Sequence, residues 1–501
     1  MDPLHQIVQS LDKAEKRYFR LFSTLFKSDS DILKLYDVLE ELIEYDEEVV
    51  KKRTGIKNLT ASKSQLRRLV LKAMRNYRED DNVADRVRSA LSEIEFLTNK
   101  NLKAEARKEI NKLLKLAVDC ELNYAVAELT VRSIMNAEAE RDKEKFFAYF
   151  DQKFLELEEG ARGMIEYYEA TMFHTMVIRY ANLFDYENPP LRRATIEGFR
   201  KKAERKLAEV KSIRAKTFYL GVLADYYYNI ADEENAIKSH QAIVDLFDIH
   251  PSLYESPKTY YFVILSNYIV SALKFERFDL VEELVVKIEE WARGMQEFYK
   301  INPDAENRVK LRVVSTRTSL YHARRDFKGL LSLEEQLREL VDDDGVINSA
   351  LNIGLIPIQV MKYVTALLMG GFLDKTHYWI ERYYSLPSAK TNKTLYLTVR
   401  TLEVIMYYNQ GDLAMADTKA LNLYKVITET AVNDPFFKEL GKFLRKLAKW
   451  NFKEEKDRNE CDAIIGAIEL QIDTESTAGL FMTNYNLRLW FNEQLATKNN
   501  S

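Results

Sequence analysis

The segment Tyr227–Ala236 (YYNIADEENA) returns in part as Tyr407–Ala416 (YYNQGDLAMA), 180 positions further along the chain. The five shared residues are two tyrosines, an asparagine, an aspartate and an alanine, each at the same place in both segments. Their spacing fits the end of one helix, a turn and the start of another helix. Such an echo indicates a chain built from repeated helix pairs, which form extended binding surfaces rather than enclosed reaction pockets.

The composition predicts an all-α fold. Of the 501 residues, 46% are hydrophobic and 30% are charged, which suits a chain with a sizeable core and a solvated surface. Glycine (15) and proline (9) are scarce, which argues against an all-β chain with many tight turns. The formal net charge of −4 is small for this length, so no global field draws the protein to nucleic acid or a membrane.

Cysteine use and hydropathy predict a cytoplasmic protein. Cys120 and Cys461 are too far apart in sequence to suggest a disulfide framework or a zinc site, so we expect buried, reduced thiols. The first residues lack the basic and apolar regions of a signal peptide. No run of about 18 apolar residues occurs, so we expect no membrane-spanning helix.

The chain is predicted to have two parts. Residues 1–80 contain three amphipathic helical patterns and are expected to form a small N-terminal helical cap. The acidic stretch Glu79–Asn82 is expected to be a joint, and residues 83–495 then alternate helices with short breaks in a helical repeat array. Gly160 and Gly163 are expected to mark one of these breaks.

The segment from Thr217 to Ile249 resembles a tetratricopeptide (TPR) repeat. Its matching positions are Leu220, Leu223, Ala224 and Tyr227 in the first helix, Asp232 in the turn, and Ala236, His240 and Ile243 in the second helix. His240 and Ile243 replace the aromatic residue and the alanine usual in the family, so this is a degenerate copy. The opening residues Ser10–Phe19 also look like the start of an uncharacterised group of bacterial TPR-like proteins, a likeness that attaches no activity.

The same register places further second helices at positions equivalent to Ala236, namely Val281, Leu330, Lys375 and Ala416. Their separations exceed the 34 residues of a standard repeat, so longer helices or connections are expected. An earlier pair is predicted at Ile94 to Val118, with its turn near Leu102. The resemblance covers about residues 90–450 and implies a right-handed α-solenoid of antiparallel helix pairs.

In a TPR array the first helix of each pair lines a concave groove. The resemblance therefore implies a partner-binding groove of polar or amphipathic residues, whose amide groups suit a peptide backbone and whose cations suit carboxylates. The alternative is an ordinary solvated surface. The groove residues so selected are Asp225, Tyr228, Asn229, Asn267, Lys274, Arg312, Ser319, His322, Thr401, Tyr408 and Asn409.

Residues 51–78 contain ten basic side chains and no acidic one. Part of this segment follows a short turn with the proportions of a helix-turn-helix unit, which can lie against phosphates. Residues 31–48 are strongly acidic, so the two segments could instead pair with each other or be solvated, and a protein partner is a third alternative. The predicted basic patch consists of Arg67, Arg68, Lys72, Arg75 and Arg78.

No motif for catalysis, nucleotide binding or metal binding is present in the sequence. Gly370–Thr376 resembles a phosphate loop only faintly, because Asp374 stands where glycine is needed. The six histidines are scattered without helical pairing. We therefore expect no enzyme, cofactor or metal site, and a scaffold that binds a protein or peptide. A nucleic-acid-associated regulator and a structural subunit of a larger assembly are the alternatives.

Overall fold

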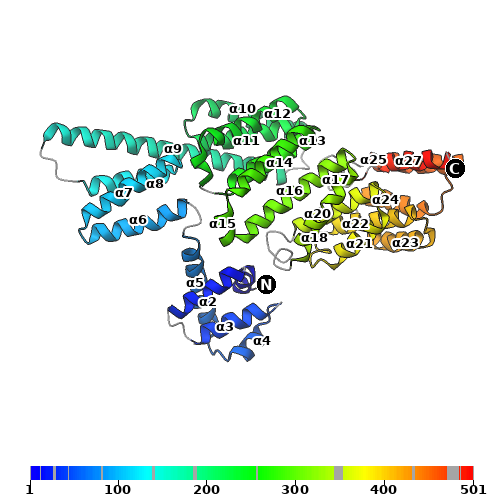
Figure 1. The fold of residues 1–501 in the computed structure, drawn as a ribbon, viewed down its shortest axis with the longest axis horizontal. Coiled ribbons are helices and arrows are strands. Elements are labelled where there is room, and N and C mark those ends of the chain that lie inside the picture. The colour runs from blue at the N-terminus through cyan, green and yellow to red at the C-terminus, as the bar shows by residue number, and fades with distance from the viewer. Residues whose placement is uncertain are drawn as a thin grey trace. The chain divides into compact units, whose positions relative to one another are not determined.

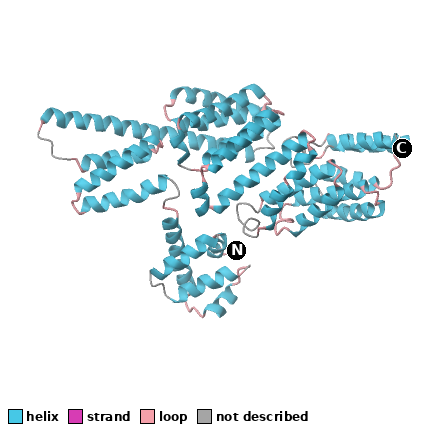
Figure 2. Cartoon of the chain, viewed as in Figure 1, coloured by secondary structure: helices cyan, strands magenta, loops and turns pink. Residues whose placement is uncertain are grey.

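The computed structural model describes residues 2–11, 13–25, 30–42, 44–79, 83–137, 142–183, 189–255, 258–343, 354–430, 435–470, 485 and 487–499. Within these residues the regular secondary structure is helical, without a strand, so the all-α prediction is confirmed (Figures 1 and 2). The chain divides into two compact units, Met1–Asn302 and Pro303–Ser501, which are considered separately below.

The first five helices of unit 1 share a hydrophobic cluster of their own, built around Phe19, Tyr36, Leu66 and Val70. Lys63 of α5 donates to the Asp2 carboxylate at 2.9 Å, which joins α5 to the cap of α1. These helices are α1 (Pro3–Ser10), α2 (Lys13–Leu25), α3 (Ser30–Glu41), α4 (Glu47–Thr54) and α5 (Leu59–Tyr77).

The rest of unit 1 is a succession of helices in which neighbours along the chain pack on one another. Residues 80–82 of the predicted joint lie outside the described residues. The helices are α6 (Val83–Asn99), α7 (Lys103–Asp119), α8 (Asn123–Met135), α9 (Lys143–Leu183), α10 (Pro189–Glu209), α11 (Ile213–Asn229), α12 (Glu233–Ile249), the short 3₁₀ helix η1 (Pro251–Glu255), α13 (Tyr260–Lys274), α14 (Phe278–Arg293) and α15 (Gln296–Ile301).

Unit 2 continues this pattern around a single large hydrophobic cluster that extends from Leu311 to Phe491. Its fully buried side chains include Trp379, Tyr363 and Phe443. The helices are α16 (Pro303–Ala323), α17 (Phe327–Ser332), α18 (Glu334–Asp342), α20 (Leu355–Met369), α21 (Leu373–Ser385), α22 (Lys393–Asn409), α23 (Leu413–Thr430), α24 (Pro435–Leu447), α25 (Glu455–Glu469) and α27 (Leu487–Asn499).

The echo in the sequence corresponds to one turn built twice. Between α11 and α12, the backbone N–H of Asp232 donates to the Tyr227 carbonyl at 2.9 Å, and the Asp232 side chain caps α12. Between α22 and α23, the backbone N–H of Asp412 donates to the Tyr407 carbonyl at 3.1 Å, and the Asp412 side chain caps α23. Both turns are the Schellman type of helix ending, in which one residue takes a left-handed conformation.

This turn occurs seven times among the described residues. In each case the N–H that follows the left-handed residue donates back five positions to a helix carbonyl. The predicted turn near Leu102 is one of the seven. The left-handed residues, with φ between 50° and 80°, are Asn101, Glu121, Ala231, Glu276, Arg325, Gly371 and Gly411.

The turns also correct the predicted register at one place. Five positions after the left-handed residue, a buried side chain such as Ala236, Val281 or Ala416 packs between the paired helices. After Gly371 this place belongs to Thr376, which is fully buried, rather than to the predicted Lys375. Gly370 and Gly371 can both adopt a left-handed conformation, so the sequence does not decide which of the two is the left-handed residue of the turn.

The break expected at Gly160 and Gly163 is wrong, because α9 runs unbroken from Lys143 to Leu183. Both glycines let α8 approach α9 closely. A Cβ atom at Gly160 would lie 3.1 Å from the Ala127 backbone nitrogen, and one at Gly163 would lie 2.5 Å from the Asn123 side chain. Glycine here serves helix packing rather than helix termination.

Candidate functional site

The helices α11, α13, α16 and α20 are mostly buried on two flanks and leave a narrow row of accessible side chains, called here the stripe of each helix. In α13, for example, the stripe recurs at helical spacing while most other side chains are buried. The stripes consist of Asp225, Tyr228 and Asn229 in α11, Val263, Asn267, Val270 and Lys274 in α13, Arg308, Arg312, Ser315, Ser319 and His322 in α16, and Ile358, Lys362 and Met369 in α20.

In unit 1 the stripes of α11 and α13 meet at Lys274. Its ammonium lies 3.8 Å from the centre of the Tyr228 ring and donates to the Tyr228 carbonyl at 2.7 Å. Asn229 donates to the Asp225 carbonyl at 2.8 Å, while Asn267 is exposed. Asp225 is reached by solvent, yet the dense protein around it removes enough hydration to raise the pKa of its carboxyl to about 6.

In unit 2 the stripes of α16 and α20 bring cations together without a counter-ion among the described residues. Arg312 and Lys362 are both partly buried, and neither makes a hydrogen bond or ion pair with any described residue. Burial lowers the pKa of Lys362 and the charge of Arg312 lowers it further. The pKa of Arg312 is lowered in the same way by burial and then by Arg308. Burial and the neighbouring cation therefore both favour the deprotonated, neutral form of these two side chains.

The same stripes carry two of the remaining predicted groove residues. The His322 ring contacts the Met369 sulfur at 2.9 Å, and burial lowers the pKa of this histidine. The Ser319 hydroxyl donates to the Ser315 carbonyl at 3.1 Å. Eight of the predicted groove residues thus lie on accessible stripes, five in unit 1 and three in unit 2.

The last three predicted groove residues, Thr401, Tyr408 and Asn409, do not lie on an open surface. Thr401 and Tyr408 are buried. The Trp490 ring of α27 packs at 5.7 Å from the Tyr408 ring, and its indole N–H donates to Asn409 at 3.1 Å. For Tyr408 and Asn409 the reason is tertiary, because Trp490 lies more than 80 residues further along the chain.

All five residues of the predicted basic patch are exposed, four of them on α5 and Arg78 at its C-cap. Arg78 pairs with Glu15 at 2.5 Å, whereas Arg67, Arg68 and Arg75 make no ion pair with any described residue. Ion pairs between the basic and acidic segments involve Lys51, Arg53 and Lys63, outside the patch. On α3, Asp37 and Glu40 pair with Arg20 of α2 at 2.9 and 2.6 Å. The predicted pairing of the two segments therefore leaves most of the patch open.

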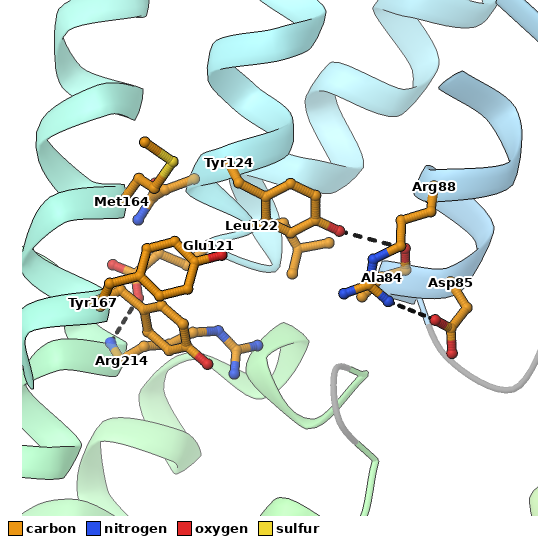
Figure 3. A pocket seen from close by; sticks show the side chains of 11 residues that line it. Ala84, Asp85, Arg88, Glu121, Leu122, Tyr124, Met164, Tyr167 and Arg214 are labelled. Atoms are coloured by element: carbon orange, nitrogen blue, oxygen red, sulfur yellow. Dashed lines mark hydrogen bonds and ion pairs between the residues drawn. The ribbon is translucent and has the colours of Figure 1, made fainter. Parts of the chain in front are cut away.

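A pocket of about 390 Å³ lies in unit 1, at a place where the sequence contains no recognisable motif (Figure 3). It is formed by the start of α6, the turn between α7 and α8, the middle of α9 and the start of α11. Tyr124, Tyr167 and Tyr168 supply aromatic surface, and Arg88 pairs with Asp85 at 2.6 Å beside it. The remaining lining residues are Ala84, Glu121, Leu122, Asn123, Met164 and Arg214.

Two of the charged residues that line this pocket, Glu121 and Arg214, have structural partners. The Glu121 carboxylate accepts the backbone N–H groups of Ile213 and Arg214, each at 2.6 Å, at the start of α11. The buried Arg214 guanidinium donates to the carbonyls of Cys120 and Leu253. Burial lowers the pKa of Arg214, which the nearby Glu121 opposes. Both side chains are therefore engaged in holding helices together.

Among the described residues, no group of three or more His, Cys, Asp or Glu side chains is placed to hold a metal ion. The described helices include none with the length and apolar character needed to cross a membrane. Comparison of the chain with protein-family models, curated proteins and solved structures yields no significant match.

Proposed function

We propose that the chain is a non-enzymatic scaffold that binds protein or peptide on its stripes, those of α11 and α13 within unit 1 and those of α16 and α20 within unit 2. In this proposal the helix pairs form a right-handed TPR-like solenoid in the cytoplasm. The recurrence of one turn at seven places supports a repeated unit. Thr401, Tyr408 and Asn409 are left out of the binding surface because Thr401 is buried and Trp490 of α27 contacts the other two.

The observation that carries this proposal is the pair of unpartnered cations, Arg312 and Lys362, which no described residue neutralises. A partly buried charge loses hydration, and the free energy is recovered only when an opposite charge or a hydrogen-bond acceptor arrives. Lys419 in the same unit, by contrast, pairs with the buried Glu403. A bound segment with acidic or carbonyl groups would supply the missing acceptors along the stripe.

Site-specific photo-cross-linking tests the stripes directly. A photoreactive residue at Asn267 or Ser319 is expected to capture a discrete partner from cells that make the protein. The same residue at Lys238 or Glu335, which are exposed on the second helices α12 and α18, serves as the matched control. Equal capture from stripe and control positions, with all variants folded, would contradict the proposal.

A second function, nucleic-acid binding by α5, is favoured by one observation. Arg67, Arg68 and Arg75 are exposed and unpaired with described residues on a helix that follows α4 and the left-handed turn at Gly55. Fluorescence anisotropy with duplex DNA and with RNA should then show affinity that falls steeply with salt. The double variant Arg67→Glu/Arg68→Glu should abolish it, and Lys103→Glu on α7 should not. No binding at low salt would exclude this function.

A further inference from the structure

The helix α9 carries a continuous apolar row on its open side. Phe147, Phe154, Ile165, Tyr168, Met172 and Met176 are all exposed. Phe150, Leu157 and Ala161 occupy the intervening turns of the same row. The nine residues advance in eight steps of three or four, about 3.6 on average, so the row stays on one side of a straight helix. We call this row the α9 seam.

The other sides of α9 already have their partners within the chain. Gly160 and Gly163 face α8, and Ala170 and Phe173 are buried in the cluster shared with α10 and α11. Apolar residues thus lie on more than one side of this 41-residue helix. A surface helix of a monomer needs only one apolar side, because its other side faces water.

The seam is large enough for a stable interface. Aromatic side chains bury about 150–250 Å² each, so half-exposed residues along eight helical turns offer several hundred Å². The largest apolar patch on a typical monomer is about 300–600 Å². A standard protein interface buries about 800 Å² per partner. The seam, with the polar side chains that border it, approaches that size.

We propose that the α9 seam binds the same seam of a second copy of the chain, with the two helices antiparallel and crossing at Ala161. This interface is independent of the proposed partner-binding stripes. A two-fold interface requires a self-complementary patch. The seam meets this requirement, because positions four, seven and eleven residues before Ala161 are Leu157, Phe154 and Phe150, and those after it are Ile165, Tyr168 and Met172.

The chemistry of these pairs fits an antiparallel contact. Each pair joins a residue of the first half of the seam to a larger or comparable apolar residue of the second half. Phe150 meets Met172, and thioether sulfur packs favourably on aromatic rings. Ala161 at the centre is small, so the helix backbones can approach closely where they cross.

Two charged residues beside Ala161 point to the same geometry. Glu158 and Arg162 are exposed, and neither makes an ion pair with any described residue. Around a two-fold axis at Ala161, Glu158 of one copy faces Arg162 of the other, and the contact occurs twice. Opposite charges that border an apolar seam set partner and orientation in paired helices.

Sedimentation velocity of the full chain tests the proposal. The wild type is expected to sediment at twice the chain mass of 58.7 kDa. Ile165→Asp, on the seam, should give monomers. Leu155→Asp is the matched control, because Leu155 is 62% exposed and Ile165 63%, but Leu155 lies off the seam. A monomeric wild type at 100-fold above typical cellular concentration, or equal dissociation by both variants, overturns the proposal.

Charge exchange and cross-linking test the two-fold axis itself. Glu158→Arg and Arg162→Glu should each weaken the dimer at least tenfold, and the double exchange should restore it. Ala161→Cys should form an intermolecular disulfide under mild oxidation, and Leu155→Cys should not. The two native cysteines are buried and should not compete in this reaction. If the charge exchange leaves the dimer affinity unchanged and Ala161→Cys gives no cross-link, the dimer forms through another surface, which contradicts the proposal.

Discussion

Glu121 and Arg214 exchange contacts across more than 90 residues of sequence. The Glu121 carboxylate accepts the backbone N–H of Arg214 at 2.6 Å, and the Arg214 guanidinium returns to the carbonyl of the neighbouring Cys120 at 3.0 Å. Glu121 is itself the left-handed residue of the turn between α7 and α8. The turn conformation thus aims a carboxylate at the start of α11, where the helix dipole favours negative charge.

Replacing Glu121 by glutamine should destabilise unit 1. The glutamine keeps one oxygen that can accept a backbone N–H, but it loses the negative charge and the second accepted hydrogen bond. We therefore expect the free energy of unfolding to fall by about 1–2 kcal/mol. Ser212 still caps α11, which limits the effect. Urea unfolding followed by circular dichroism measures it. Glu128→Gln, which removes only a surface pair with Arg132, is the control and should change little. Equal effects would mean that the cap contributes nothing.

Glycine at a left-handed turn residue should stabilise the chain. Ala231 has φ of 58°, a conformation that costs an L-residue with a side chain about 1 kcal/mol. Ala231→Gly should therefore raise the free energy of unfolding by up to about 1 kcal/mol. Gly411→Ala, at the equivalent turn, should lower it by a similar amount. Changes of the same sign in both variants would refute this account of the turns.

Two helical glycines should respond oppositely to alanine. At Gly198 in α10 an added methyl group would have no other atom within 4 Å, so Gly198→Ala should stabilise by about 1 kcal/mol through helix propensity. At Gly160 the added methyl group meets the backbone of α8 at 3.1 Å, so Gly160→Ala should lose this gain and lower the melting temperature. Thermal unfolding compares the two directly. Equal stabilisation by both would show that α8 and α9 are not closely packed.

Acid should weaken the packing of α12 on α13 through His240. This ring is buried, stacks on Tyr268 at 5.3 Å and contacts the Ser271 hydroxyl at 2.9 Å. Burial lowers the pKa of His240 to about 4, from an ordinary value of 6.5. The unfolded chain therefore binds the extra proton between pH 6.5 and 4. The resulting stability is complete above pH 6.5 and is lost as the pH falls towards 4, by up to roughly 3 kcal/mol.

The variant His240→Phe isolates this contribution, because an aromatic ring of similar shape remains without a titrating group. Its unfolding free energy should fall less than that of the wild type between pH 6.5 and 4.5. His174 and His322, whose pKa values burial also lowers, are unchanged in the comparison. Parallel pH profiles for variant and wild type would exclude His240 as a cause.

Local features of the sequence were sufficient for the turn that defines the helix pairs. Asp232 and Asp412 cap helices through side-chain bonds within three residues, and Ala236 and Ala416 face inward one helical turn later. Such short-range chemistry can be read from spacing alone. Asn267 and Lys274 were selected through the resemblance to TPR repeats instead, and both are exposed on the stripe of α13.

Contacts between distant segments escaped that reasoning. Nothing near Tyr408 in the sequence indicates that Trp490 covers it, and nothing near Glu121 indicates its place at α11. Lys362 was also missed, because its proximity to Arg312 is a contact between two helices that the local sequence does not show. At Gly160 a helix break was predicted where the helix continues, because glycine occurs both at helix ends and where two helices pack closely.

The cover that α27 forms over α22 also has a consequence for self-assembly. A row of stacked helix pairs has an apolar flank at its last pair, and an open flank of this kind can accept the first pair of another molecule. Trp490 and Phe491 are buried against that end of unit 2. Within the described residues, Trp490 covers the flank of α22 at Tyr408 and Asn409, so this flank offers no open apolar surface for end-to-end growth.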